Sequence, residues 1–525
     1  MNSTTDRQRA GRQISECWRR LALLALLGIA AGCARLPPRA DLPPMEALPA
    51  ATHGGIAERT AVAEAAHPGL SGFHLVAEGT EAYALRAFTA QAAASSLDIQ
   101  TYIWHADLTG RLLARHALQA ADRGVRVRIL VDDLDARAKN AGLAALDAHP
   151  SIEVRLYNPT GSRSGRLHKA GEYAFGFSRL NHRMHNKSWI ADGRLALVGG
   201  RNLGNEYFNA SEGAANFLDL DVLMAGPVVA EVSRNFDRYW NSEASYPIAR
   251  LSPQAGDPAN LEKLRVALDA SLDELSGSGY EQVLREDPQV QSILGDDPRV
   301  HWSGQWRFVS DDPLKARLPL EQRSEVVQAL LPEILGAGQR VLVISPYFVP
   351  GERGTAALVQ AAGRGADVRV LTNSLAANDV AAVHGGYSRY RGPLLEGGVR
   401  LWELKRSGEQ PKFSLAGSSG SSLHTKAMVV DSDHAFIGSY NLDPRSTSLN
   451  TEQGVLVGHP ALAAELAALF ARQTDPGHAW IVTRDGAGRL HWSDGERSWA
   501  REPEATASQR SLAWLVKLLP VESQL

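Results

Sequence analysis

The stretches that decide the fold are His185–Asp192, which reads HNKSWIAD, and His424–Asp431, which reads HTKAMVVD. Both follow the pattern H-x-K-x-x-x-x-D. From average residue usage, one such match arises by chance in a chain of this length with a probability of about 0.03. Two matches in similar surroundings therefore indicate an internal duplication.

The sequence around the two copies also repeats. VGGRN at 198–202 follows the first copy, and IGSYN at 437–441 follows the second. Further along the chain, LDLDV at 218–222 aligns with TEQGV at 451–455. A repeat of this length is a whole domain rather than one unit of a solenoid, so we predict two similar domains.

Helical and strand patterns alternate in both halves, which favours α/β architecture. We therefore predict two tandem α/β domains in which mixed sheets are flanked by helices. The predicted helices are 81–95, 110–123, 261–275, 325–335 and 355–364, and the predicted strands are 97–104, 125–131, 152–156, 340–345, 368–372 and 399–404.

Changes in composition divide the chain further. The predicted parts are a signal-like segment at 1–33, a Pro/Ala-rich linker at 34–70, a first domain at 71–250, a polar insertion or linker at 251–300, a second domain at 301–500 and a tail at 501–525. The tail contains the apolar run SLAWLVKLL at 511–519. Such a run either lies on a membrane surface or forms a last helix packed on the body.

The N-terminal segment has the features of an export signal. Several arginines precede the apolar run LALLALLGIAA at 21–31, which is about half as long as a spanning helix. The following residues, Ala30–Cys33, resemble a bacterial lipobox, in which the cysteine is lipidated after cleavage. We therefore expect a membrane-associated protein, anchored through Cys33 and facing the periplasm.

The overall charge and the cysteines exclude some functions. The 525 residues carry a formal net charge of -3, so no global basic field attracts a polyanion and no nucleic-acid partner is expected. The two cysteines, Cys17 and Cys33, both belong to the N-terminal segment. The remaining chain therefore contains neither a disulfide nor a thiolate zinc site.

The H-x-K spacing suits phosphodiester chemistry. In a strand, residues two apart point to the same face, so His185 with Lys187 and His424 with Lys426 are predicted each to present an imidazole and an ammonium together. The lysines neutralise phosphate oxygens. One histidine can attack phosphorus while the other protonates the leaving oxygen and then activates the acceptor hydroxyl. No metal or other cofactor is required.

Four further side chains are assigned to this pocket. Asn202 and Asn441 can donate neutral hydrogen bonds to the phosphate. Asp192 and Asp431 are expected to accept a hydrogen bond from Nδ1 of an imidazole and so to fix its tautomer. For Asp219 and Glu452, structural ion pairing and a role in the site remain equally open.

The doubled motif resembles that of the phospholipase D superfamily, over most of residues 75–500. Runs such as LVGGRNLG at 197–204, LTNSLAAND at 371–379 and DPRS at 443–446 are similar to bacterial cardiolipin synthases of the C type. The resemblance implies one active site where the two domains meet. It assigns catalytic roles to His185, Lys187, Asp192, His424, Lys426 and Asp431, and substrate-binding roles to Asn202, Asn441, Ser439 and Glu452.

The resemblance also implies a reaction. A phosphatidyl group from phosphatidylethanolamine or phosphatidylglycerol would be joined to phosphatidylglycerol through a phosphatidyl-histidine intermediate. The implied partners are membrane phospholipids and the membrane surface, and any accessory protein is unknown. The alternatives are a hydrolase of the same fold, acting on phospholipid or on nucleic acid, and a catalytically silent lipid-binding scaffold.

Two segments outside the motifs have two interpretations each. Polar residues within Asn373–Arg391 either bind a lipid head group or form a polar helix surface. The aromatic residues Tyr102, Trp104, Tyr347 and Phe348 end equivalent strands. They either line an acyl channel or pack in the core.

Overall fold

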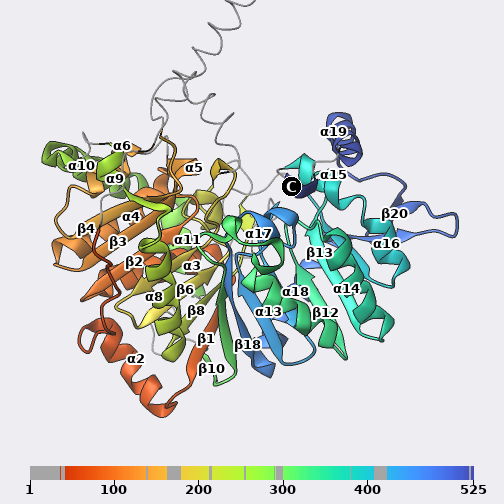
Figure 1. The fold of residues 1–525 in the computed structure, drawn as a ribbon, viewed down its shortest axis with the longest axis horizontal. Helices are drawn as coiled ribbons and strands as arrows, with labels where there is room; N and C mark the ends of the chain where they lie inside the picture. The colour runs from red at the N-terminus through yellow and green to blue at the C-terminus, as the bar shows by residue number, and fades with distance from the viewer. Residues whose placement is uncertain are drawn as a thin grey trace, which may run out of the picture.

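The computed structural model describes residue 36 and residues 42–524 except 137–139, 162–178, 212–215, 253–255, 289, 291–298, 379, 407–421 and 520–521. The signal-like segment and Cys33 lie outside the described residues. Two halves lie side by side, and each is built around one large sheet (Figure 1).

The first sheet has the strand order β10-β1-β8-β6-β5-β2-β3-β4-β9. The pairs β2–β3 and β3–β4 are parallel, and the other neighbours are antiparallel. The strands are β1 (Ser71–Val76), β2 (Ser96–Thr101), β3 (Arg126–Asp132), β4 (Ile152–Tyr157), β5 (Ser188–Ala191), β6 (Leu195–Gly199), β8 (Asp221–Ala225), β9 (Ser245–Pro247) and β10 (His301–Ser303).

The second sheet repeats this order as β11-β18-β17-β16-β12-β13-β14-β19-β20-β21. Its parallel pairs, β12–β13 and β13–β14, occupy the same places as those of the first sheet. The strands are β11 (Trp306–Ser310), β12 (Arg340–Ile344), β13 (Asp367–Asn373), β14 (Arg400–Leu404), β16 (Ala427–Val430), β17 (His434–Gly438), β18 (Gln453–Gly458), β19 (Ala479–Arg484), β20 (Leu490–Ser493) and β21 (Ser498–Trp499). The prediction of two tandem α/β domains with mixed sheets is confirmed.

Helices cover both faces of each sheet (Figure 1). In the first half they are α2 (Gly55–Ala66), α3 (Gly79–Ala92), α4 (Leu108–Asp122), α5 (Asp133–Ala136), α6 (Asn140–Leu146), α8 (Pro227–Trp240), α9 (Ile248–Leu251), α10 (Pro258–Leu275) and α11 (Gly279–Glu286). In the second half they are α13 (Glu325–Gly336), α14 (Gly351–Gly363), α15 (Ala381–Tyr387), α16 (Arg391–Glu396), α17 (Pro444–Ser448), α18 (Pro460–Gln473) and α19 (Ala507–Leu518).

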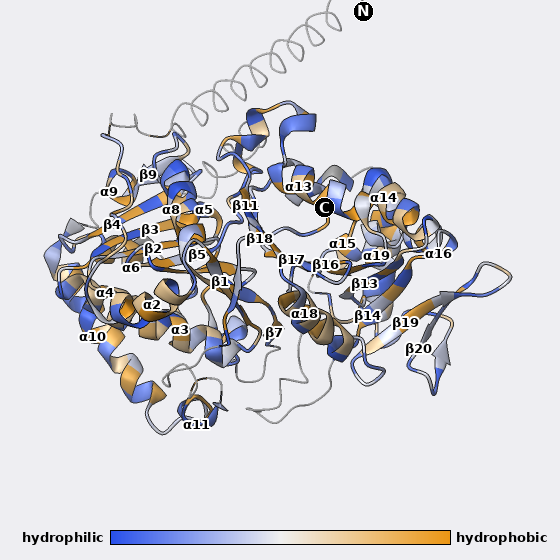
Figure 2. Ribbon diagram, turned by 90° about the horizontal axis from the view of Figure 1, so that it is seen from below, coloured by the Kyte–Doolittle hydropathy of each residue, from blue (hydrophilic) through white to orange (hydrophobic). Residues whose placement is uncertain are grey.

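One hydrophobic core joins the two domains. It contains side chains of α8 and α18 together with residues of both sheets, such as Val222 of β8 and Val455 of β18. Figure 2 shows the apolar strands inside and the polar helix surfaces outside. Because burial of apolar area is the main stabilising term in folding, this shared core fixes the two domains against each other and hence the two motifs.

Two of the predicted linkers are packed parts of the first domain. Within the predicted linker at 34–70, helix α2 packs on α3, and the backbone N–H of Ala51 donates to the carbonyl of Asp192 at 2.8 Å. Within the predicted linker at 251–300, α10 packs on α4 and α6. The linker expected at 34–70 is therefore wrong for α2, and at 251–300 the packing of α10 agrees with the insertion rather than with the linker. The predicted helix at 261–275 is confirmed as part of α10.

The C-terminal run forms helix α19, which packs on α15. Among the described residues, no helix is both long enough and apolar enough to cross a bilayer.

Candidate active site

Short backbone pairings hold each His-x-Lys segment against the other domain. The backbone N–H of His185 donates to the carbonyl of Thr451 at 2.9 Å, and that of His424 donates to the carbonyl of Leu218 at 2.7 Å. Beside His424, β15 (Ser422–Leu423) pairs in parallel with β7 (Phe217–Leu218). Both segments are extended chain that immediately precedes β5 or β16, rather than part of a strand.

The two imidazoles are held by carboxylates in a crossed arrangement. Nδ1 of His185 lies 2.9 Å from Oε2 of Glu452, which belongs to the second domain. Nδ1 of His424 lies 2.5 Å from Oδ2 of Asp219, which belongs to the first domain. The pKa of Asp219 is below its usual value, and its ionised carboxylate only accepts hydrogen bonds, so Nδ1–H of His424 is the donor. Nδ1 of His185 also lies 3.1 Å from the carbonyl oxygen of Ser439, which only accepts, so Nδ1–H is the donor in this ring too. Nε2 is then the basic nitrogen available for chemistry.

The two lysines are buried beside the histidines. Nζ of Lys187 donates to the carbonyl of His185 at 2.7 Å, and Nζ of Lys426 donates to the carbonyl of His424. Lys187 is 3% exposed and Lys426 is 1% exposed. The ring of Tyr102 lies 5.2 Å from the His185 ring and 5.5 Å from Nζ of Lys187. Burial therefore places both ammonium groups at fixed positions next to the imidazoles.

The electrostatics show that the two motifs form one site. Burial lowers the pKa of His185 well below its usual value, and the charges of Lys187 and Lys426 lower it further. Burial also lowers the pKa of His424, with Lys426 and Lys187 adding to the effect. Each imidazole therefore experiences the lysines of both domains. A bound anion would relieve this accumulation of positive charge.

The two carboxylates differ in their ionisation. Burial alone would raise the pKa of Asp219, but the charges of His424 and Lys426 hold that pKa below its usual range. Burial raises the pKa of Glu452 to about 7, although Lys187 opposes this rise. His424 thus has a permanently charged partner near neutral pH, whereas the partner of His185 titrates there.

Equivalent positions of the repeat also differ beside the two carboxylates. Oγ of Ser439 donates to Oε2 of Glu452 at 2.5 Å. In the first domain the equivalent residue is Gly200, where an added Cβ would lie 2.1 Å from Oδ1 of Asp219. The Asp219 carboxylate therefore leaves no room for a side chain at position 200, and no hydroxyl at this position donates to it. Ser439 thus contacts Glu452, and its predicted binding of substrate stays a prediction.

The predicted hydrogen bonds from the imidazoles to Asp192 and Asp431 are wrong. Asp192 accepts from the backbone N–H groups of Ala94, Ser95 and Ser96, at 2.7 to 3.1 Å. Asp431 accepts in the same way from residues 338–340, at 2.7 to 3.1 Å.

The reason is distance along the strand. Seven residues of extended chain separate His185 from Asp192, which is roughly 20 Å. Both aspartates have left-handed backbone, with φ of 55° at Asp192 and 52° at Asp431, a conformation that Asp tolerates. They shape the turns after β5 and β16 and hold the starts of β2 and β12.

The two asparagines lie near the site in different environments. The side chain of Asn202 accepts from the backbone N–H of Ile103 at 3.1 Å and donates to the hydroxyl of Tyr207 at 2.9 Å. The Tyr207 ring lies 5.4 Å from the His424 ring. Asn441 is 4% exposed, and its Oδ1 has no hydrogen-bond partner among the described residues. Of the two, Asn441 has the amide oxygen without a protein partner.

Described residues of the segment Asn373–Arg391 have structural contacts. The side chain of Asn373 accepts from the backbone N–H of Leu423 and donates to its carbonyl, both at 3.0 Å. This amide therefore fixes the residue that precedes His424. Arg391 is buried in an ion pair with Glu403 at 2.8 Å and contacts His384, as expected of a structural network.

The four aromatic residues divide between the site and the core. Tyr102 contacts His185, as described above. Trp104 is buried, and its Nε1 donates to the carbonyl of Gly110 at 3.0 Å. Phe348 is 1% exposed and packs on Tyr387 in the second core, which Tyr347 also contacts. Trp104, Tyr347 and Phe348 thus pack in the core, whereas Tyr102 lies at the site.

Sequence reasoning missed a pair of amides that joins the motifs. The side chain of Gln453 donates to the carbonyl of Lys187 at 2.7 Å and accepts from Asn186 at 3.1 Å. Asn186 in turn accepts from the hydroxyl of Thr451 at 2.7 Å. The available signal was position, because Asn186 lies inside the first motif and Gln453 follows Glu452.

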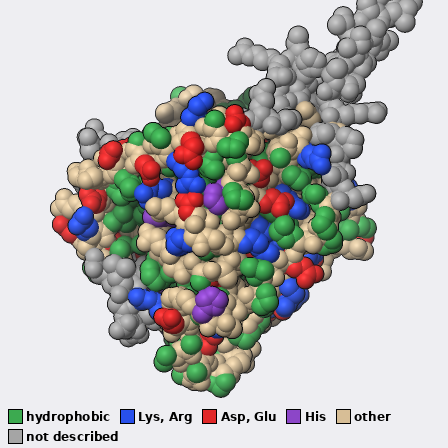
Figure 3. Space-filling view, turned by 90° about the vertical axis from the view of Figure 1, so that its left-hand side faces the viewer, with side chains coloured by type: hydrophobic (Ala, Val, Ile, Leu, Met, Phe, Trp, Pro, Cys, Tyr) green, Lys and Arg blue, Asp and Glu red, His purple; other side chains and the backbone are tan. Residues whose placement is uncertain are grey.

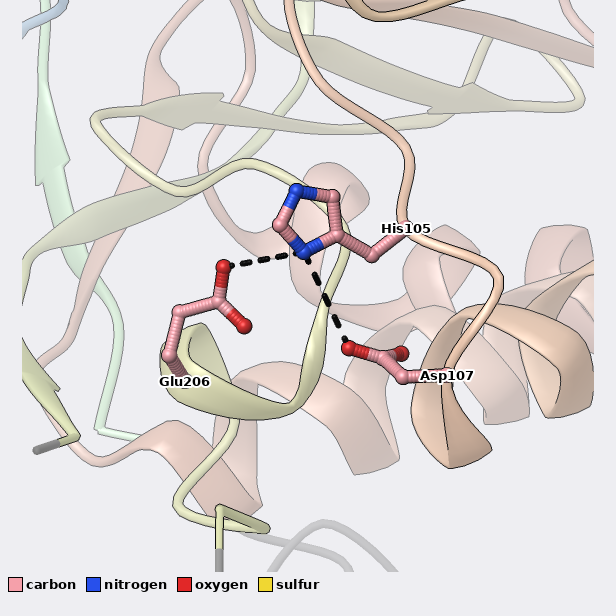
Figure 4. Close-up of side chains that lie close together, drawn as sticks. All are labelled: His105, Asp107 and Glu206. Carbon is pink, nitrogen blue, oxygen red and sulfur yellow. Dashed lines mark ion pairs between the residues drawn. The ribbon is translucent and has the colours of Figure 1, made fainter. Parts of the chain in front are cut away.

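A separate group with metal-ligand chemistry lies on the first domain (Figure 4). Nδ1 of His105 lies 3.1 Å from Glu206 and 3.9 Å from Asp107. Both oxygens of Asp107 accept backbone hydrogen bonds, from Gly110 at 3.1 Å and from Asn205 at 2.8 Å. Asp107 is the N-cap of α4, so these contacts account for the cluster as local structure.

The repeated sheets and the paired H-x-K segments define a protein of the phospholipase D class. The sequence model of the family described as "Cardiolipin synthase, PLD-like domain" matches residues 88–240 and 330–474. The chain belongs to this family, as a cardiolipin synthase homologue of the phospholipase D superfamily.

Individual relatives agree with this assignment. Cardiolipin synthase C of Escherichia coli (strain K12) is 40% identical over 467 residues, which cover 87% of this chain and 96% of the relative. Cardiolipin synthase A of Pseudomonas entomophila is 27% identical over 401 residues, covering 76% of this chain and 67% of the relative. The crystal structure of phosphatidylserine synthase from Haemophilus influenzae shares the fold, with a TM-score of 0.55 at 13% identity over 89% of this chain and 100% of the other.

Proposed function

We propose that this protein is a transphosphatidylase that makes cardiolipin, using phosphatidylglycerol as the acceptor and phosphatidylethanolamine or phosphatidylglycerol as the phosphatidyl donor. The observation that carries the proposal is the pair of carboxylate-bound imidazoles, each with Nδ1–H donated across the domain interface. Family membership and 40% identity to a cardiolipin synthase support the substrate class.

In the first step, Nε2 of His185 attacks phosphorus and the bond to the donor head group breaks. His424, as imidazolium, gives its Nε2 proton to the leaving alkoxide. Lys187 and Lys426 neutralise the non-bridging oxygens as charge develops on them. The products of this step are a phosphatidyl-His185 intermediate and the released head-group alcohol.

In the second step, neutral His424 takes the proton of a phosphatidylglycerol hydroxyl. The resulting oxygen attacks phosphorus, and the bond to Nε2 of His185 breaks. Cardiolipin is released, and His424 is again protonated for the next cycle. The proton balance therefore closes without a metal.

The two roles follow from the two carboxylates. Asp219 carries a full charge near neutral pH and stabilises an imidazolium, which suits His424 to the role of general acid. Burial and the two lysines lower the pKa of both imidazoles, but at His424 the charge of Asp219 opposes this effect. His424 is thus the ring that takes the proton once the bound phosphate relieves the lysine charges, and His185 stays the neutral base. A neutral Nε2 is the form that attacks phosphorus.

A product assay tests the proposal. The purified full chain is incubated with vesicles of phosphatidylethanolamine and phosphatidylglycerol, and the lipids are identified by mass spectrometry. Cardiolipin supports the transferase, whereas phosphatidic acid without cardiolipin supports a hydrolase of the same fold. A double variant, His185→Ala with His424→Ala, is the control for contaminating activity. If this variant restores cardiolipin in a synthase-deficient strain as well as the parent does, the silent scaffold is supported.

Hydrolysis of nucleic acid is the weaker alternative. The net charge is -3, and acidic and basic side chains are interspersed on the first-domain face that Figure 3 shows. A nuclease depends on a basic surface to bind the phosphate backbone. Release of nucleotides from single-stranded DNA by the parent chain, but not by the double variant, would favour this alternative.

We also propose that Cys33 is lipidated and that the enzyme faces the periplasm, because Ala30–Cys33 resembles a lipobox after a basic and then an apolar segment. Mass spectrometry of the protein from membranes would detect the acyl groups. A Cys33→Ala variant is expected to lose them. An unmodified Cys33 in the parent protein would contradict the proposal.

A further inference from the structure

Helix α19 exposes a row of large apolar side chains. Leu512, Trp514, Leu515, Leu518 and Leu519, at the end of the helix, are 47%, 63%, 50%, 60% and 41% exposed. With about 100° between successive residues, these five share one side of the helix. No other described helix exposes more than two large apolar side chains. We call this group the α19 face.

The opposite side of α19 already has its partner. Ala513 and Val516 are buried against α15, where an added Cβ on Gly385 would lie 2.6 Å from the carbonyl oxygen of Ala513. Such a close approach requires a residue without a side chain. The helix is thus packed through its small residues, and the α19 face points away from the protein.

Polar contacts hold both ends of α19. At its N-terminus, Thr506 and Gln509 form a capping box. At its C-terminus, the guanidinium of Arg389 donates to the carbonyl of Leu519 at 2.7 Å and forms an ion pair with Glu522 at 3.1 Å. The orientation of the exposed face is therefore fixed by the fold.

The α19 face lies on the side of the molecule that carries the histidine site. After α19 the chain continues to η5 (Glu522–Gln524), which packs on α17. Oε1 of Gln524 accepts from the side chain of Asn181 at 2.6 Å. Asn181 is four residues before His185, so the tail reaches from α19 to the first motif.

Two other exposed apolar residues lie on the same side. Leu134 in α5 is 46% exposed, and Val380, just before α15, is 41% exposed. Figure 1 shows α5, α15, α17 and α19 together at the upper side of the two sheets. Elements of both domains that carry exposed apolar residues thus lie on this side.

We propose that this side of the protein docks on a phospholipid bilayer, with the α19 face inserted between the lipid head groups. Trp514 has the amphipathic ring that favours the membrane interface. Lys517, exposed beside the apolar row, can bind an anionic lipid phosphate. Docking would bring the site to its lipid substrates, and in this respect the inference rests on the proposed function.

A second copy of the chain fits the α19 face less well. A stable dimer buries about 800 Å² on each partner. The α19 face is the outer side of a single helix that projects from the body (Figure 1). An inserted helix needs no complementary protein surface, because the acyl chains adapt to its shape.

The test measures an α19 double variant and a control double variant on two substrates. Leu515→Glu with Leu518→Glu places two charges on the α19 face, and Val62→Glu with Val266→Glu is the control at exposed positions of other helices. Cardiolipin formation is measured on phosphatidylglycerol vesicles and on short-chain phosphatidylglycerol below its micelle concentration. We expect the α19 variant to lose about tenfold or more on vesicles and to keep its rate on the soluble substrate, and the control to keep both rates.

Equal rates of the α19 variant and the parent on vesicles would overturn the docking proposal. If the parent makes no cardiolipin from either substrate, the proposed function fails instead. Analytical ultracentrifugation tests whether a second copy of the chain covers the α19 face instead. A parent dimer that becomes monomeric in the variant, with no loss of vesicle activity, would assign the α19 face to a second copy and overturn membrane docking.

Discussion

Oε2 of Glu452 lies 2.9 Å from Nδ1 of His185, although the two residues belong to different domains. The reciprocal contact, between Asp219 and His424, crosses the interface in the other direction. Neither domain therefore supplies both members of either pair in the candidate site. The shared core of α8 and α18 is what completes the site, so catalysis depends on how the domains pack.

Replacement of Asp219 tests the charged partner of His424. The variant Asp219→Asn keeps the shape of the side chain but removes the charge that stabilises the imidazolium. We expect kcat for cardiolipin formation to fall about 10²- to 10⁴-fold, the range for loss of general acid–base catalysis. The control is Asp269→Asn, at a surface position of α10. A change of less than about threefold would contradict the role of Asp219.

Replacement of Glu452 has a different pH dependence, because the pKa of Glu452 is raised to about 7. Below pH 7 the parent carboxyl is mostly protonated and resembles the amide of Glu452→Gln. Above pH 7 it is ionised and strengthens His185 as a base. We therefore expect the ratio of parent to variant rate to increase from pH 6 to pH 8. A ratio that is constant over this range would contradict the titration of Glu452.

The assignment of His185 as nucleophile is tested with a phosphatidyl donor that has a nitrophenol leaving group. Such a group departs without protonation, so it does not need the general acid. We expect His424→Ala to release one equivalent of nitrophenol rapidly and to retain a covalent adduct, which mass spectrometry can locate on His185. His185→Ala is expected to release none. The reverse behaviour of the two variants would exchange the roles.

The repeat made the domain architecture predictable, because each motif lies in a half of the chain where helical and strand patterns alternate in the sequence. Helix α2 was not predictable in this way. Its buried residues are Ile56, Ala57 and Thr60, so it has no apolar stripe to recognise. Packing on α3 and the contacts of residues 42–51 hold it, and these form only in the folded domain.

The candidate site was predictable only in part, for a related reason. His185, Lys187, His424 and Lys426 are identified by spacing within one segment. Their carboxylate partners come from the opposite domain, and no local pattern specifies a pairing between residues 185 and 452. The aspartate of each motif is close to its histidine in sequence, but the length of β5 or β16 separates them in space.

The aspartates of the motifs are expected to affect stability more than catalysis. Asp431→Ala leaves the backbone N–H groups of residues 338–340 without their acceptor, at a cost of about 1–3 kcal/mol. We expect a lower midpoint in urea unfolding and a kcat within about twofold of the parent for the folded protein. Asp192→Ala, at a fully buried position, should be less stable still. A large loss of kcat without loss of stability would restore a catalytic role.

Acid is expected to destabilise the protein through a buried neutral histidine. His116 in α4 is 8% exposed. Burial, together with the charge of Arg115, lowers its pKa to about 4. In the unfolded chain the same ring titrates near 6.5.

The direction in which the free energy of unfolding changes with pH follows from the difference between these two pKa values. Below pH 6.5 the unfolded chain takes up a proton at residue 116 that the folded protein does not bind, so the free energy of unfolding decreases until the pH reaches about 4. The loss amounts to about 3 kcal/mol. In urea unfolding at pH 7, 5.5 and 4, His116→Gln should lose about 3 kcal/mol less stability than the parent over this range. The control His478→Gln, at an exposed position, should follow the parent. Parallel acid dependence in the parent and His116→Gln would mean that His116 is already protonated in the folded protein.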